Sequence, residues 1–198
     1  MQQIVDFILE VDRLKGVERR AKPLGHQRYE NSAEHSWQIA LLALSLAHVA
    51  PSQVEISRVV RMLLVHDIGE IDTGDTIVYA EGGWTERKAA ERAAIDRIFG
   101  LLPAAPRDEF TALWQEFEEN ATAEARFANA LDRAMPVLLN LANDGQSWRE
   151  NGISYEQVVR RVAPPIREGC PALWAYLEPQ LERERDRGWF GIGKERKP

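Results

Sequence analysis

His66 and Asp67 stand side by side at the end of a strongly apolar segment that runs from Val54 to Val65. Gly69 and a further carboxylate, Glu70, follow at once. Charged groups placed beside a buried segment are costly unless they are paired or hold a metal, because a protein interior solvates charge poorly. We therefore interpret this pair as the centre of a divalent-metal site, to which the other helices must bring further ligands.

Apolar residues recur at helical spacing along most of the chain, whereas strand-like alternation is nearly absent. Ser32 is the predicted N-cap of one helix, and Ser52 with Glu55 forms a capping-box pattern before the next. The segments 23–31 and 72–75 are predicted to be loops. The spacing predicts helices over 4–14, 32–49, 54–65, 85–102, 110–117, 123–142, 154–162 and 171–185. The fold class is therefore all-α.

Length and composition exclude several classes of protein. A chain of 198 residues suits a single domain, with a core over about 4–145 and a C-terminal helical extension over about 153–198 that is interrupted at Pro164-Pro165. The formal net charge of −6 argues against sequence-independent nucleic-acid binding, which needs a positive surface. Because no long apolar run or signal peptide is present, we expect no membrane partner and a cytoplasmic location. Cys170 stands alone, so neither a disulfide nor a cysteine zinc site is available.

Three polar positions lie on or at the ends of the apolar stripes of three different predicted helices. His35 begins one stripe, and His66 lies seven residues after Val59 on the buried side of another. Asp132 lies beside a third stripe, and Pro136, four residues later, is expected to kink that helix. Each residue alone has an ordinary explanation as a hydrogen-bonded core group. Together with Asp67, the carboxylate of the His-Asp pair, they supply mixed nitrogen and oxygen ligands whose two negative charges balance one divalent ion.

These residues resemble the motif of the HD-domain phosphohydrolase superfamily, which is H…HD…D on a helical bundle. The string Glu34-His35-Ser36 and the string H-D-I-G-E-I-D-T-G-D at 66–75 are most similar to the bacterial and eukaryotic 5′-deoxynucleotidase branch. The resemblance covers roughly residues 7–143. It implies a helical bundle in which the whole chain, 1–198, forms one HD domain with a single metal site between its helices.

The resemblance also implies roles for individual residues. Glu70 would activate the attacking water or assist the leaving alkoxide, and Asp75 would lie near the substrate sugar or that water. Arg19 would match the phosphate-binding arginine, with Arg20 beside it as an alternative, at a position where the family has an aromatic residue. One divalent ion, Co²⁺, Mn²⁺, Fe²⁺ or Zn²⁺, would be held by the four ligands His35, His66, Asp67 and Asp132.

The activity that this resemblance implies is a metal-dependent 5′-nucleotidase that releases phosphate from deoxyribonucleoside monophosphates, working as a homodimer on a small-molecule nucleotide. Apart from the two ligand histidines only His26 and His48 remain, which is too few for the family's phosphodiesterases with two or three metals. A guanosine tetraphosphate-type or other nucleotide hydrolase stays open, although that type has a Glu-Asp pair where this chain has Glu70-Ile71. A non-catalytic metal- or nucleotide-binding module is a further alternative, against which the presence of Glu70 counts.

Overall fold

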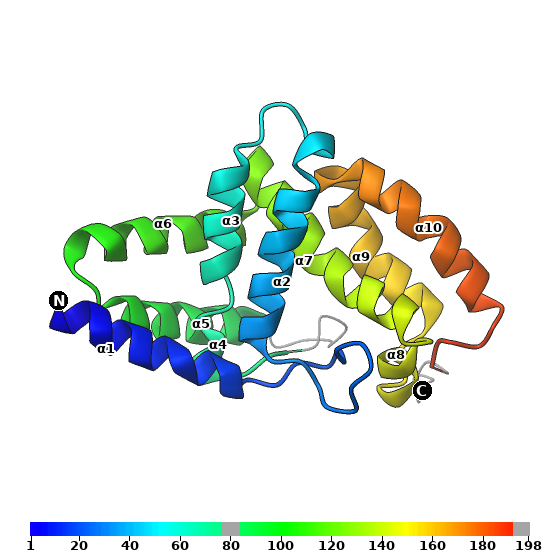
Figure 1. Cartoon of the computed structure of the whole chain (residues 1–198), viewed down its shortest axis with the longest axis horizontal. Coiled ribbons are helices and arrows are strands. Elements are labelled where there is room, and N and C mark those ends of the chain that lie inside the picture. The colour runs from blue at the N-terminus through cyan, green and yellow to red at the C-terminus, as the bar shows by residue number, and fades with distance from the viewer. Residues whose placement is uncertain (77–83, 192–198) are drawn as a thin grey trace.

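The computed structural model describes residues 1–76 and 84–191, and within these ranges every named element is a helix (Figure 1). The predicted all-α fold class is thereby confirmed. No helix of the described ranges is both long and apolar enough to cross a membrane. In chain order the elements are α1 (Gln2–Val11), η1 (Asp12–Gly16), α2 (Ser32–Ser45), η2 (Ala47–Val49), α3 (Ile56–Val65), α4 (Glu70–Thr73), α5 (Trp84–Phe99), α6 (Ala104–Glu119), α7 (Ala123–Ala142), α8 (Gln146–Glu150), α9 (Tyr155–Gly169) and α10 (Pro171–Arg185).

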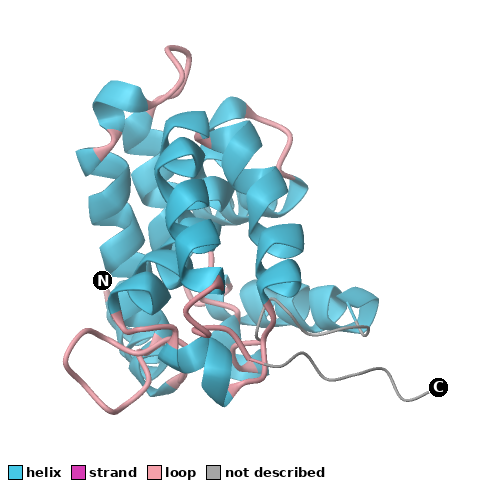
Figure 2. Ribbon diagram, turned by 90° about the vertical axis from the view of Figure 1, so that its right-hand side faces the viewer, coloured by secondary structure: helices cyan, strands magenta, loops and turns pink. Residues whose placement is uncertain are grey.

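Helix α7 is the centre of the bundle. Helices α2, α3 and α6 pack against it, and so do α9 and α10 from the other direction (Figure 1). Because α7 is covered on several sides, it is apolar around most of its circumference, as a fully buried helix must be. Its small residues Ala125, Ala128, Ala130 and Ala134 are completely buried and let the neighbouring helices approach closely. The bundle is seen along a second direction in Figure 2. The division into a core and a C-terminal extension remains a prediction.

The beginnings of α2 and α3 differ from the sequence-based expectation. Asn31, not Ser32, caps α2: its side chain accepts from the Glu34 backbone N–H at 2.9 Å, and the Glu34 carboxylate accepts from the Asn31 N–H at 3.1 Å. The predicted capping box before α3 is absent, because the N–H of Glu55 donates instead to the carboxylate of Glu124 at the start of α7. Helix α2 also ends at Ser45, and η2 follows it.

Helix α9 continues through Pro164 and Pro165, where the sequence predicted an interruption. Each proline in a helix interior costs about 3 kcal/mol, because it removes a backbone donor and crowds the preceding turn. Against this, α9 buries apolar side chains where it packs on α7, and each of its buried valines and its isoleucine contributes roughly 1.5–3 kcal/mol. A capping box between Ser154 and Gln157 adds about 1 kcal/mol. Tertiary packing therefore outweighs the local preference of the prolines. The buried apolar residues of α9 are Val158, Val162, Ala163 and Ile166.

We expect Gly169→Ala to destabilise the fold by about 1–3 kcal/mol, the usual cost of overpacking a close contact. A Cβ atom at Gly169 would lie 2.0 Å from the backbone oxygen of Arg126 and 2.8 Å from the Cβ of Ala130, so α9 would have to move away from α7. Denaturant unfolding measures the effect. Gly16→Ala is the matched control, because no atom lies within 4 Å of the added carbon there. Equal stability of the two variants would contradict the packing argument.

Candidate metal centre and active site

Three of the four predicted ligands converge between α2, α3 and α7. His35 of α2, His66 directly after α3 and Asp132 of α7 each bring one ligand atom within 4.8 Å of the other two. All three side chains are buried. The Nε2 atom of His35 lies 2.9 Å from Asp132 Oδ1, and that of His66 lies 3.8 Å from the same oxygen. The cluster thus offers two imidazoles and a carboxylate at one point.

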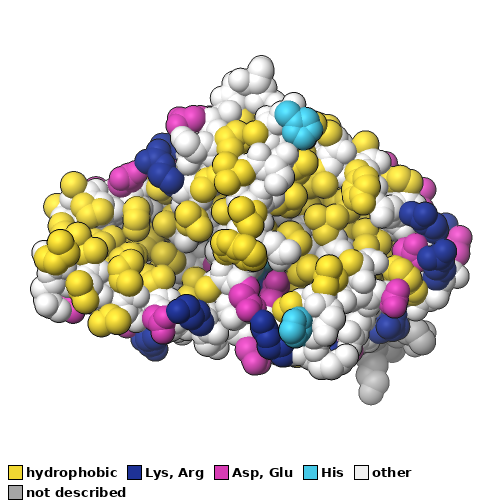
Figure 3. Space-filling model, in the orientation of Figure 1, with side chains coloured by type: hydrophobic (Ala, Val, Ile, Leu, Met, Phe, Trp, Pro, Cys, Tyr) yellow, Lys and Arg dark blue, Asp and Glu magenta, His cyan; other side chains and the backbone are white. Residues whose placement is uncertain are grey.

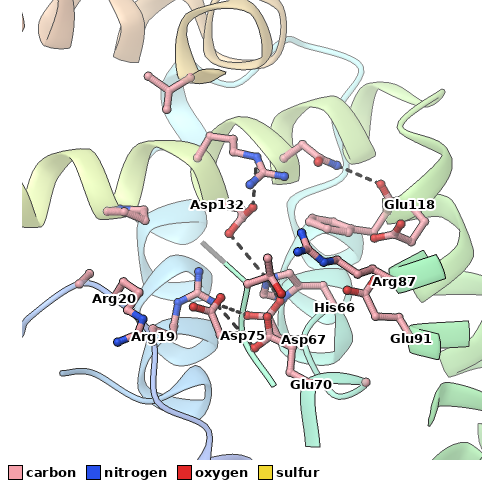
Figure 4. A pocket seen from close by; sticks show the side chains of 18 of the residues that line it. Arg19, Arg20, His66, Asp67, Glu70, Asp75, Arg87, Glu91, Glu118 and Asp132 are labelled. Atoms are coloured by element: carbon pink, nitrogen blue, oxygen red, sulfur yellow. Dashed lines mark hydrogen bonds and ion pairs between the residues drawn. The ribbon is translucent and has the colours of Figure 1, made fainter. Parts of the chain in front are cut away.

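Asp67 borders this cluster. Its Oδ1 lies 3.0 Å from His66 Nε2, and its Oδ2 accepts a hydrogen bond from Arg19 at 2.8 Å (Figure 4). Asp67 is therefore shared between His66 and Arg19, whereas His35, His66 and Asp132 face one another directly. The dipeptide at 66–67 places the two side chains together because the chain leaves α3 in a tight turn toward α4.

The hydrogen bonds of His66 fit a metal ligand. Its Nδ1 lies 2.8 Å from the Leu63 carbonyl oxygen, which can only accept, so Nδ1 carries the proton. The Nε2 atom points into the cluster and, among the described residues, is buried without a well-aligned hydrogen bond. A ligating histidine commonly donates its second ring N–H to a carbonyl or carboxylate, which fixes the tautomer and frees the other nitrogen for the metal. The residues present therefore suit a divalent ion.

Electrostatics lead to the same conclusion. Burial alone would raise the pKa of Asp67, but His66 and Arg19 outweigh it and hold this pKa at about 2. Burial likewise opposes ionisation of Asp132, yet Arg133 and the two histidines keep its pKa well below the usual range. Burial would lower the pKa of His66, but the two carboxylates raise it to about 10. The cluster thus favours a positive charge at its centre.

Glu70, the first residue of α4, lies beside the cluster. The buried hydroxyl of Ser32 donates to its Oε2 at 2.5 Å, and Arg19 lies 3.8 Å from the same oxygen. Burial, together with the charges of Asp67 and Asp75, raises the pKa of Glu70 well above its ordinary value, although Arg19 and Ser32 act in the opposite direction. A raised pKa brings this carboxyl closer to the range in which it can both take up and release a proton.

The guanidinium of Arg19 lies among several carboxylates. Its side chain is 12% exposed, and besides Asp67 it lies 3.7 Å from Asp75 and 3.5 Å from Glu30. Burial would lower the pKa of Arg19, but the charges of Asp67, Asp75, Glu70 and Asp132 raise it, so the guanidinium stays charged. Arg20 is exposed and lies with its guanidinium 5.7 Å from the Tyr29 ring. Both arginines line the same cavity, and Arg19 is the one that reaches the acidic cluster (Figure 4).

Asp75 lies at the end of a segment that is only partly the predicted loop. Asp72 and Thr73 belong to α4, and Gly74 ends that helix with φ at +72°, a conformation that glycine adopts without strain. This turn directs Asp75 back toward Arg19. Burial raises the pKa of Asp75 even though Arg19 lies nearby.

Two residues of the site were not predicted as such. Glu30 is only 2% exposed and lies beside both His35 and Arg19, and Ser32 was predicted only as a helix cap. Neither stands in a pattern that sequence periodicity can detect. Their roles depend on partners from other elements, namely the carboxylate of Glu70 for Ser32 and the guanidinium of Arg19 for Glu30.

A cavity of about 240 Å³ opens onto the cluster. Its walls are charged at the candidate metal centre, and apolar where Trp148 of α8, Ile153 between α8 and α9, and Val162 of α9 line it. On the side of α5 and α6 it is lined by Arg87, Glu91 and Glu118 (Figure 4). A small molecule with one anionic end and one apolar face would match this division.

A helical bundle with a His, His-Asp, Asp arrangement is the combination expected of an HD-domain protein, and the comparison with known families agrees. The chain belongs to the HD domain family, whose model matches residues 11–174. The match extends from the end of α1 into α10 and includes every predicted site residue.

Within this family, the chain is similar to several individual proteins over most of its length. The chain is 30% identical to the 5′-deoxynucleotidase HDDC2 of Homo sapiens over 138 residues, which are 69% of this chain and 66%, just under two thirds, of that protein. It is also 30% identical to a 5′-deoxynucleotidase of Citrobacter koseri over 69% of this chain and 73% of that one. A crystal structure described as a predicted metal-dependent phosphohydrolase from Magnetospirillum magnetotacticum MS-1 is 41% identical, with a TM-score of 0.90 over 96% of this chain and 97% of that one.

Proposed function

We propose that this protein is a divalent-metal-dependent 5′-nucleotidase that hydrolyses deoxyribonucleoside 5′-monophosphates to a deoxynucleoside and phosphate. The observation that carries the proposal is the convergence of His35, His66 and Asp132 at one point. Of these, His66 and Asp132 line the same cavity as Glu70 and Arg19. The relatives named 5′-deoxynucleotidase support the choice of substrate.

The ion would be held by His35, His66, Asp67 and Asp132, a donor set that suits Co²⁺, Mn²⁺, Fe²⁺ or Zn²⁺. When bound, such an ion would neutralise phosphoryl charge and make a nucleophilic hydroxide available near neutral pH. The carboxylates of Asp67 and Asp132 are already ionised without it, because neighbouring positive groups hold both of their pKa values low. The protein therefore presents charged ligands before an ion arrives.

Three further residues would handle the substrate. Arg19 would bind a phosphoryl oxygen, since a guanidinium has five N–H donors and among its described contacts only the one to Asp67 is a hydrogen bond. Glu70 would hold the proton at its carboxyl group, taking it from the attacking water and giving it to the leaving 5′-oxygen. Asp75, 3.7 Å from Arg19, would lie close to the sugar or the attacking water.

Phosphate release from a substrate panel tests the proposal. Metal-stripped protein, with each of the four ions added back, is offered deoxyribonucleoside 5′-monophosphates, their ribonucleotide counterparts, 3′-monophosphates and guanosine tetraphosphate. We expect metal-dependent release that is fastest with the deoxy 5′-monophosphates. Turnover of guanosine tetraphosphate alone would select that alternative hydrolase. Metal binding without turnover of any compound would favour a non-catalytic binding module.

We also propose that the protein is a homodimer. Large apolar side chains are exposed on α1 and on the packed pair α2 and α3, and Figure 3 shows apolar atoms spread over this side of the molecule. Monomers rarely expose large contiguous apolar patches, because such patches favour association. The side chains of this apolar face are Ile4, Val5, Ile8 and Leu9 of α1, Trp37, Leu41 and Leu44 of α2, and Leu64 of α3.

The cytoplasmic location of the protein stays a prediction.

Light scattering in solution is expected to give twice the 22.5 kDa mass of the chain. Trp37→Glu should shift the protein to the monomer, because a carboxylate would be buried unpaired in the interface. Tyr176→Glu is the matched control, since that side chain is equally exposed, at 59% against 61%, but lies on α10 outside the apolar face. A wild-type monomer would contradict the proposal. A dimer that both variants preserve would show that this apolar face is not its interface.

A further inference from the structure

Glu30 is a buried carboxylate that the proposed chemistry does not use. Its Oε1 lies 3.7 Å from His35 Nδ1 and 3.5 Å from Arg19 Nε, so it stands between a candidate metal ligand and the candidate phosphate-binding arginine. Both Oε1 and Nδ1 are buried without a hydrogen-bond partner among the described residues. Arg19 supplies the positive charge that a buried carboxylate needs, but that ion pair does not require the same oxygen to lie beside His35, and this second proximity requires an explanation.

The backbone holds Glu30 at this point. The segment after η1 pairs in antiparallel fashion with the segment before α2, through an isolated bridge between Glu18 and Asn31. The N–H of Arg19 donates to the Glu30 carbonyl at 2.9 Å, and the N–H of Glu30 donates to the Ala21 carbonyl at 2.9 Å. The capping box that begins at Asn31 then fixes the first turn of α2, on which His35 lies. The two segments paired by this bridge therefore position the side chains of Arg19, Glu30 and His35 relative to one another.

Glu30 can decide which nitrogen of His35 faces the metal. A neutral imidazole that binds a metal through Nε2 carries its proton on Nδ1, and a nearby acceptor stabilises that tautomer. For His66 this acceptor is the Leu63 carbonyl, whereas His35 has Glu30 Oε1 in the corresponding place. We infer that Glu30 is a positioning residue: when His35 presents Nε2 to the metal, Glu30 Oε1, 3.7 Å from Nδ1 in this structure, is the acceptor for Nδ1–H, and the same carboxylate orients Arg19. This inference rests on the proposed function, because it takes His35 as a metal ligand.

Two substitutions of similar size separate this role from a merely structural one. Glu30→Gln keeps an oxygen that can accept from His35 Nδ1–H, whereas Glu30→Met does not. Since both remove the charge, a difference between them reports the acceptor. Glu18→Gln is the control, because Glu18 lies on the same paired segment with its side chain exposed.

The measurement is Mn²⁺ affinity of the metal-stripped full chain by calorimetry, with thermal unfolding of each metal-free variant recorded alongside. We expect Glu30→Met to weaken Mn²⁺ binding about 10–100-fold, the usual effect of removing such a supporting group. Glu30→Gln should stay close to the wild type in Mn²⁺ affinity but show a raised KM, because Arg19 loses its charged neighbour. A structural role would lower the unfolding temperature and leave the Mn²⁺ affinity of the folded protein unchanged.

Equal Mn²⁺ affinity of Glu30→Gln and Glu30→Met would overturn the inference and leave the proposed function intact. If Glu30→Met does not fold, Glu30→Ala takes its place in the comparison, since it also lacks an acceptor. A wild-type protein that binds none of Mn²⁺, Co²⁺, Fe²⁺ and Zn²⁺ would instead overturn the proposed function, and the inference with it.

Discussion

His66→Ala is expected to abolish tight metal binding and to lower phosphate release by about 10³-fold or more, because the metal supplies most of the charge stabilisation in this kind of site. The side chain is buried, its Nδ1 is held by the Leu63 carbonyl, and its Nε2 points at Asp67 and Asp132. No neighbouring imidazole can replace it, since His35 already occupies its own place in the cluster.

The same substitution should also reduce the stability of the metal-free protein. The pKa of His66 is raised to about 10, so in the metal-free protein its imidazolium offsets the charges of Asp67 and Asp132. This contribution to stability is fully present below the unfolded-state pKa of about 6.5 and is lost as the pH rises through about 10. Removing the ring should therefore lower the unfolding temperature at pH 6–7 and lower it much less above pH 10.

Calorimetric metal titration, metal analysis of the purified protein and the phosphate-release assay measure these effects below the unfolding temperature of the variant. His48→Ala is the control, because His48 lies exposed on η2 and is not part of the cluster. Retention of wild-type metal affinity by His66→Ala would show that the ion binds elsewhere. Loss of activity with full metal retention would instead limit His66 to contact with the substrate.

The elements predicted correctly from the sequence are those that local information determines. Helix α7 was predicted with its observed bounds, because a buried helix carries apolar residues in every turn, and in the structure the side chain of Thr122 caps its start. The same local reasoning failed at Pro164 and Pro165, where packing of α9 on α7 outweighs the preference of proline. It also chose Ser32 as the helix cap, although Asn31 performs that role.

The residues of the site also divide into those that the local sequence indicates and those that only the fold brings together. His35, His66 and Asp132 could be found because each is a polar residue in an apolar stripe, and the resemblance joined them into one motif. Glu30 and Ser32 could not be found in that way, because the role of each depends on a side chain of another element that only the fold brings near, Arg19 for Glu30 and Glu70 for Ser32. Ser32 lies 38 positions from the Glu70 carboxylate to which it donates. Supporting residues of an active site thus escape a periodicity argument even where the ligands do not.

Glu70→Gln is expected to lower kcat by about 10²–10⁴-fold, the range that general acid–base groups contribute, while metal affinity stays near the wild-type value. Glu70 lies outside the trio of convergent ligands, and its raised pKa suits proton transfer. Glutamine keeps the size and can still accept from Ser32, but it cannot take up and release a proton at neutral pH. The combined measurement is steady-state phosphate release and Mn²⁺ titration on the same preparation.

Two further variants sharpen the test of Glu70. Asp72→Asn is the matched control, because Asp72 lies two residues away on α4, is exposed and pairs with Arg97 instead of the cluster. Ser32→Ala removes the hydroxyl that lowers the pKa of Glu70, so the pH profile of kcat should move to higher pH while metal binding is unchanged. If Glu70→Gln lost metal as well as activity, Glu70 would be a ligand. If it kept both, the proton would have to be handled by another group, and Asp75 would be the first to examine because it lies on the same cavity with a raised pKa.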